Sequence, residues 1–123
     1  MDLTEAEARA DFEGDREMIR ERVERLIRDF EDDPFEPLLL EEAKGMGRFL
    51  RSAIDLFEGH EEVLPYHFTD TVFLDQVTAA KEAMIEAQKH FEETNVAGMS
   101  CVYLLQKILE RFDEIVFVDE LPV

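Results

Sequence analysis

The sequence contains one cysteine, four prolines and no tryptophan, and basic residues are scarce beside acidic ones. The single Cys101 cannot form a disulfide within the chain, which favours a reducing compartment. No apolar run approaches the roughly 18 residues that a membrane-spanning helix needs, and the acidic N-terminus lacks the apolar core of a secretory signal. We therefore expect a cytoplasmic protein that does not bind or cross a membrane.

Charge of one sign dominates the chain. The 31 acidic residues outnumber the 13 basic ones, so the net charge is −18, and the excess is spread along the whole sequence. Such a field repels nucleic acid and anionic membranes, and it attracts cations and basic protein surfaces. The acidity is typical of a solvated protein surface, and adaptation to a salt-rich cytoplasm or mimicry of nucleic acid are alternative reasons for it.

Helical periodicity occupies most of the chain. Apolar residues recur at alternating intervals of three and four, which is the pattern of helices that bury one face. The periodicity predicts helices over about residues 4–32, 38–58, 70–93 and 97–115. Their expected core residues are Phe12, Ile19, Val23, Leu26 and Phe30; Leu39, Ala43, Met46, Leu50, Ala53 and Phe57; Phe73, Val77, Ala80, Met84, Ala87 and Phe91; and Val102, Leu105, Leu109, Phe112 and Val116.

Local signals mark the ends of these helices. Thr4 and Glu7 form a capping-box pattern at the start of the first helix. Thr69 or Asp70 can cap the third helix, and Gly59 is a natural terminator of the second. The boundaries therefore agree with the periodicity.

The short connectors indicate the topology. Four helices of about 20 residues joined in this way are expected to run antiparallel to their sequence neighbours. We predict a single all-α domain over residues 1–123, an antiparallel four-helix up-and-down bundle with a short extended C-terminal tail. The β-branched and aromatic run at residues 115–118 leaves a short strand as an alternative for part of that tail.

Glycines interrupt two of the predicted helices. Gly14 is a possible break in the first helix, and Gly45 and Gly47 flank Met46 in the second. Glycine costs a helix about 1 kcal/mol relative to alanine, so we expect this pair where another helix approaches closely or the chain kinks. A dinucleotide-binding loop would need a preceding strand and a third glycine, and position 50 is leucine.

The predicted connector between the second and third helices is the best candidate for a functional site. It combines histidines with acidic and phenolic groups beside a helix N-terminus, and histidine can titrate near neutral pH. The candidate residues for an interaction or a ligand are His60, Glu61, Glu62, Tyr66, His67 and Asp70. Alternatively, the polar groups of this connector face water while its larger side chains pack over the end of the bundle, namely Val63, Leu64, Tyr66 and Phe68.

Acidic pairs at helical spacing are a weaker candidate for a metal site. Glu58 and Glu61 are three residues apart, as are Glu110 and Asp113, and carboxylate pairs of this kind hold Mg²⁺ in some helical enzymes. A chain with 31 acidic residues forms such pairs by chance, and a whole predicted helix separates these two. We expect no cofactor, with a divalent metal ion as the alternative.

The sequence offers no convincing catalytic set and favours a non-enzymatic helical interaction protein, an adaptor or regulator. Apolar residues beside the predicted core, among them Phe49, Ile54 and Val72, predict a homodimer because monomers rarely expose large apolar patches. Another protein with a basic or apolar surface is a possible partner. The alternative is a metal-dependent helical-bundle enzyme or metal binder that uses acidic and histidine residues near residues 58–70.

Overall fold

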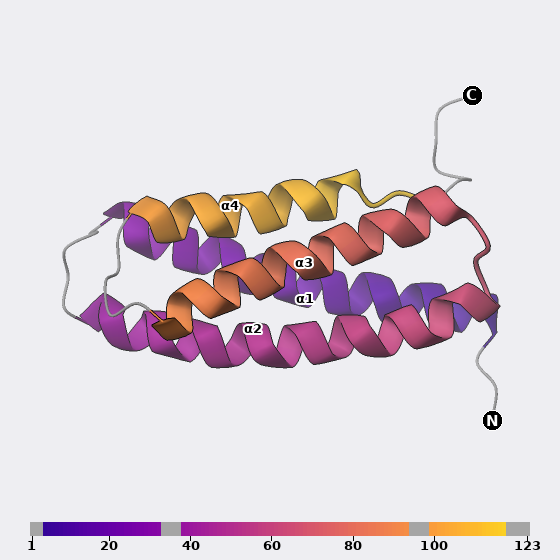
Figure 1. The fold of residues 1–123 in the computed structure, drawn as a ribbon, viewed down its shortest axis with the longest axis horizontal. Helices are drawn as coiled ribbons and strands as arrows, with labels where there is room; N and C mark the ends of the chain where they lie inside the picture. Colours follow the sequence, from indigo (N-terminus) through magenta and orange to yellow (C-terminus); the bar gives the residue numbers. More distant parts are fainter. Residues whose placement is uncertain (1–3, 33–37, 94–98, 118–123) are drawn as a thin grey trace.

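Four long helices dominate the computed structural model, which describes residues 4–32, 38–93 and 99–117. The elements are α1 (Glu5–Asp32), α2 (Leu38–Val63), the short 3₁₀ helix η1 (Leu64–Tyr66), α3 (Thr71–Glu93) and α4 (Met99–Glu114). Consecutive helices run in opposite directions along one long axis (Figure 1). Because α1 and α3 each pack against both α2 and α4, the helices form a ring around one core. The predicted antiparallel four-helix bundle is confirmed.

The predicted apolar faces build this core. Every predicted core residue of α1, α2 and α3 whose side chain is described is buried, and no polar or charged side chain is buried in the described ranges. The expectation for α4 was partly wrong, because Leu109 and Val116 are only half-buried. Ile108 and Ile115 are buried in their place, at 0% and 2% exposure. The side chains of Phe30, Leu39, Ala43 and Cys101 lie outside the described residues.

The α4 difference has a physical reason in the sequence. Apolar residues occupy two neighbouring rows of this helix, so two faces satisfy the same three-four spacing. Contact with α1 and α3 selects the row that contains Leu105, Ile108 and Phe112. The periodicity therefore predicted a buried helix here, but not its rotation about its own axis.

Side chains cap the starts of two helices as predicted. The amide of Glu7 donates to Oγ1 of Thr4 (3.1 Å), and the Thr4 hydroxyl bonds Oε1 of Glu7 (3.1 Å). At the start of α3, the amide of Val72 donates to Oδ1 of Asp70 (3.0 Å). These bonds satisfy amides that have no partner within the helix.

The predicted end of the second helix at Gly59 is wrong. The helix α2 continues to Val63 and leads directly into η1. Leu64, seven residues after the core residue Phe57, is fully buried, so the apolar face continues past the glycine. A Cβ built on Gly59 would meet no atom within 4 Å, and no described glycine has a positive φ. Gly14, the other predicted break, also lies within a continuous helix.

One glycine of the pair in α2, Gly47, marks a close approach of α3. The helix is unbroken through Gly45 and Gly47, so the chain does not leave the helix there. A Cβ on Gly47 would lie 3.5 Å from the Cβ of Phe91, and Gly47 is buried. Close packing therefore accounts for Gly47, whereas the nearest such atom to Gly45 is in the Arg48 side chain at 3.7 Å.

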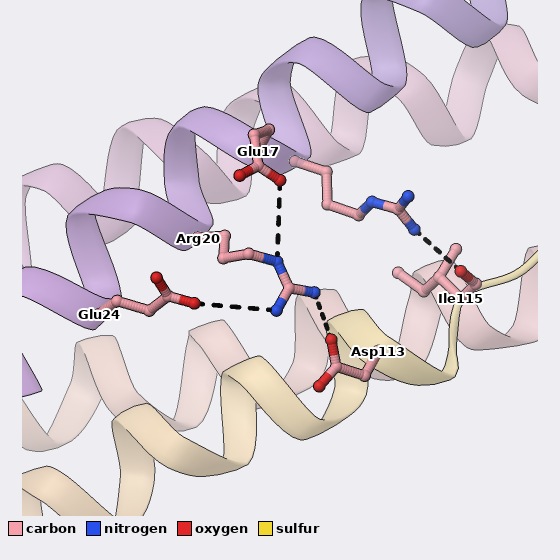
Figure 2. A network of polar contacts seen from close by, with 6 residues as sticks. Glu17, Arg20, Glu24, Asp113 and Ile115 are labelled. Atoms are coloured by element: carbon pink, nitrogen blue, oxygen red, sulfur yellow. Dashed lines mark hydrogen bonds and ion pairs between the residues drawn. The ribbon is translucent and has the colours of Figure 1, made fainter.

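The chain leaves the helix after Glu114 and stays in contact with the bundle through residue 117. Nη1 of Arg16 donates to the carbonyl oxygen of Ile115 (2.9 Å), and this carbonyl is visible in Figure 2. The amide of Val116 donates to Oε1 of Gln76 (3.2 Å). Ile115 and Phe117 are both buried, at 2% and 3% exposure. This part of the tail contains no strand, and the rest of the tail lies outside the described residues.

Within the described ranges, no helix is both long and apolar enough to cross a bilayer.

Candidate functional site

A cleft of about 530 Å³ opens at one end of the bundle. At this end α1 begins, η1 leads into α3, and the chain leaves α4 (Figure 1). Three segments distant in sequence therefore meet there. The lining residues are Glu5, Arg9, His67, Phe68, Thr69, Asp70, Phe73 and Phe117. We call this feature the end cleft.

Phenylalanine rings form the floor of the end cleft. Phe73 and Phe117 are stacked with their ring centroids 4.6 Å apart, and Phe68 lies 5.1 Å from Phe117 and 5.5 Å from Phe73. Phe12 supports them from below, 5.8 Å from Phe73. Aromatic pairs at such distances contribute about 0.5–1.5 kcal/mol each beyond their buried area. The rings that form the floor are therefore packed against one another and against the core.

Charged residues lie over and beside this floor. The guanidinium carbon of Arg9 lies 4.0 Å from the centroid of Phe117, a cation–π contact, and its Nε is 3.9 Å from Oε1 of Glu13. Asp70 uses one carboxylate oxygen to cap α3. An apolar floor with charged groups of both signs over and beside it suits an amphipathic ligand.

His60 lies away from the end cleft. Its Nε2 donates to Oδ2 of Asp15 (2.8 Å), and its ring lies edge-on to Phe12 at 5.3 Å between centroids. The side chain is only 13% exposed. The histidine therefore connects α2 to α1.

Glu61 is bound to the neighbouring helix. Its Oε2 accepts a bond of 2.7 Å from Nζ of Lys81 in α3. This hydrogen bond raises the pKa of Lys81 above its ordinary value of 10.5, while burial opposes the change. The other carboxylate oxygen of Glu61 is buried and accepts no hydrogen bond from the described residues. Glu61 therefore stabilises the packing of α2 against α3.

Replacing Lys81 by methionine is expected to lower the free energy of unfolding by about 1–2 kcal/mol at pH 8, because Glu61 would keep a partly buried charge without its partner. A raised pKa means that the stabilisation is complete below pH 10.5 and is lost as the pH rises through the higher value in the folded protein. Urea unfolding of both proteins between pH 8 and 11.5 should show the difference shrink above pH 10.5.

The matched control for this prediction is Lys89→Met, since Lys89 is exposed on the same helix. It should change the stability by less than about 0.5 kcal/mol. Adding Glu61→Gln to Lys81→Met should recover part of the loss, because the unpaired charge is then removed. A loss of equal size for Lys81→Met and Lys89→Met would contradict this role of the pair.

The other four residues of the predicted connector site divide into two groups. His67 and Asp70 line the end cleft. Glu62 is exposed and Tyr66 is 87% exposed, so neither faces the cleft. The alternative interpretation is correct for Leu64 and Phe68, which pack against the core, and wrong for Tyr66.

The structure does not gather the four metal-site candidates. Glu58 and Glu110 are exposed, and Glu61 is bonded to a lysine. Asp113 is bonded to Arg20, which also contacts two glutamates of α1 and so links α1 to α4 (Figure 2). In the part of the chain that the structure describes, no group of three or more His, Cys, Asp or Glu is placed to hold a metal ion.

Sequence reasoning did not connect three of the eight lining residues with the predicted connector site. Glu5 and Arg9 come from the first turns of α1, and Phe117 follows α4. No local pattern connects these residues with the connector before α3. The one signal for Phe117 was the apolar run at the end of the last predicted helix. That run indicated that the segment is buried, but not which part of the protein covers it.

The chain was compared with known proteins. No protein-family model matches it, and no curated protein or solved structure is significantly similar to it. The fold and the end cleft thus define its class, an all-α four-helix bundle with an aromatic cleft at one end.

Proposed function

We propose that the protein is a non-enzymatic interaction protein, an adaptor or regulator, that receives an apolar side chain of a partner protein in the end cleft. The observation that carries this proposal is the cleft itself, with its volume of about 530 Å³ and its floor of three phenylalanines. Ligand sites commonly have volumes of about 300–1,000 Å³ and are mainly apolar with a few polar groups.

The surroundings of the cleft favour binding over catalysis. Arg9 is engaged by the ring of Phe117 and by Glu13, and Asp70 caps a helix. These charged groups already have structural partners, so they are better suited to orient a ligand than to transfer protons. A metal-dependent enzyme or metal binder remains the alternative, but no observation favours it.

The charge of the chain indicates the chemistry of the partner. A net charge of −18 attracts basic surfaces over distances beyond the cleft. We therefore expect the partner to offer an aromatic or aliphatic residue flanked by lysines or arginines. The single cysteine and the acidity suit a cytoplasmic protein, which we propose acts as a homodimer.

An NMR titration with the peptide Lys-Lys-Phe-Lys-Lys tests the proposal. Amide shifts of the ¹⁵N-labelled protein should saturate and be largest at Phe68, Phe73 and Phe117. The peptide Lys-Lys-Ser-Lys-Lys is the matched control, because it keeps the charge and lacks the ring. Its shifts should be weak and spread over the acidic surface.

Two outcomes would count against this function. Equal responses to both peptides would show that only charge is recognised and that the cleft receives nothing. Saturable shifts on adding Mg²⁺ or Zn²⁺, centred on Glu58 and Glu61, would favour the metal-binding alternative. The variant Phe68→Ala, at a half-buried position of the floor, should weaken peptide binding without unfolding the protein.

A further inference from the structure

Two hollows lie along the line where α1 and α2 meet at the surface, which we call the seam. One hollow of about 250 Å³ is lined by Asp11 and Asp15 of α1 and by Asp55 of α2, among others. A second hollow of about 210 Å³ lies further along the same two helices and is lined by Arg22 and Arg25, among others. The seam therefore has an acidic part and a basic part.

Two exposed apolar residues lie along the seam, and one of them, Leu56, lines the acidic hollow. Met18 of α1 is 47% exposed and Leu56 of α2 is 38% exposed. Two contacts join α1 to α2 along this seam. One is the bond between His60 and Asp15, and the other is the contact between Arg22 and the ring of Phe49. Met18 and Leu56 each fall between these contacts along their own helix.

The charges on α1 follow one helical stripe. Its members, in chain order, are Asp11, Asp15, Met18, Arg22 and Arg25. The intervals of four, three, four and three place them on one face of the helix. Acidic residues thus occupy one half of the stripe, methionine the centre and arginines the other half. At 1.5 Å per residue, the stripe is about 21 Å long.

This stripe is complementary to itself. Asp11 and Arg25 are each seven residues from Met18, on opposite sides. When two copies of α1 pair antiparallel about Met18, Asp11 of each copy faces Arg25 of the other, and Asp15 faces Arg22. A two-fold interface requires this kind of pattern, because the same patch must match itself after rotation.

The second helix of the seam has the same polarity. Asp55 lines the acidic hollow. Arg48, which is exposed, lies seven residues before Asp55 and so on the same face of α2. Charges of opposite sign therefore lie toward opposite ends of the seam on both helices.

Three of the four stripe charges are available to a second copy, and the fourth, Asp15, is bonded to His60. Arg22, Arg25 and Asp11 are exposed, and none of them forms an ion pair with another described residue. The Arg22 contact with Phe49 leaves its charge unneutralised. Asp29 also lines the basic hollow, so we limit the self-complementary part to the stripe from Asp11 to Arg25.

We infer that the α1–α2 seam binds a second copy of this chain, with the two-fold axis at Met18. The inference rests on the proposed homodimer and adds its surface and orientation. Two chains of charge −18 repel each other over long distances. Salt at 0.1 M largely removes this repulsion beyond about 10 Å. The contacts across the seam act at shorter range, so the dimer is expected to tighten between 0.05 and 0.3 M salt.

Charge reversal at Asp11 and Arg25 tests the inference. Asp11→Arg places two arginines opposite each other in the homodimer, and Arg25→Glu places two acids there. Each variant alone should dimerise at least about tenfold more weakly than the wild type in sedimentation velocity at 0.3 M salt. An equimolar mixture of the two should form a heterodimer with nearly wild-type affinity, because both pairs are then complementary. The double variant in one chain should also recover the homodimer.

Matched controls separate the local contact from net charge. Glu110→Arg changes the net charge as Asp11→Arg does, and Lys89→Glu changes it as Arg25→Glu does. Both positions are exposed, on α4 and α3, and neither variant should weaken the dimer comparably.

The possible outcomes distinguish the seam from the dimer. A wild-type protein that stays monomeric at 0.3 M salt would overturn the proposed homodimer together with this inference. A wild-type dimer that tolerates both reversals would overturn the seam alone. Weak single variants whose mixture and double variant do not recover would overturn the antiparallel pairing about Met18.

Discussion

Truncating Leu50 or Leu105 to alanine is expected to lower the free energy of unfolding by about 2–5 kcal/mol. Both side chains are fully buried, in the middle of α2 and α4 respectively. Each substitution removes apolar contacts and leaves a cavity that a four-helix core can close only in part. Urea or guanidinium unfolding followed by circular dichroism measures the loss.

Val72→Ala is the control for this prediction. It truncates an apolar side chain of α3 that is 62% exposed and lies outside the α1–α2 seam, and it should cost less than about 1 kcal/mol. Losses below about 1 kcal/mol at both Leu50 and Leu105 would mean that these faces do not form the core. The ring arrangement of the helices would then be wrong.

Replacing Gly47 by leucine is expected to destabilise the protein by about 1–3 kcal/mol, because the added side chain would enter the contact between α2 and α3. Alanine should be tolerated or slightly stabilising. Its Cβ would lie at an ordinary contact distance of 3.5 Å from the Cβ of Phe91, and alanine favours a helix by up to about 1 kcal/mol over glycine. Thermal melts of the two variants compare these effects.

Gly14 offers the matched control within α1. A Cβ at this position would meet no atom within 4 Å, so both Gly14→Ala and Gly14→Leu should be tolerated or stabilising. If Gly47→Leu proved as harmless as Gly14→Leu, the close approach of Phe91 to α2 would not constrain this position.

The two proposed surfaces have a joint consequence. The end cleft lies at the start of α1, whereas the proposed dimer axis passes Met18 near the middle of that helix. Antiparallel pairing would therefore place the two clefts toward opposite ends of the dimer. Such a dimer could engage two partner segments at once, and linked binding of this kind raises affinity without any new contact.

The sequence by itself determined the helices and most of the core. Alternating intervals of three and four leave one apolar face on each helix, and burial of that face is the main source of stability. The six predicted core residues of α3, from Phe73 to Phe91, are all buried. Thr4 and Asp70 cap their helices because their side chains can bond amides close by in the chain. These features depend on local chemistry alone.

Only the tertiary structure decided features that depend on more than one helix. The rotation of α4 was ambiguous because two apolar rows shared one spacing, and its neighbours buried Ile108 and left Leu109 half-exposed. The helix α2 continued past Gly59 because Leu64 found a place in the core, which outweighed the weak helix preference of glycine.

The candidate site shows the same division between local and distant information. His67 and Asp70 were recognised in the connector before α3, but Arg9 and Phe117 reach the cleft from opposite ends of the chain. His60 stood out as a ligand candidate, yet it bonds Asp15 of another helix. A sequence pattern reports on neighbours within a few turns of one helix, whereas these contacts form only when folding brings distant segments together.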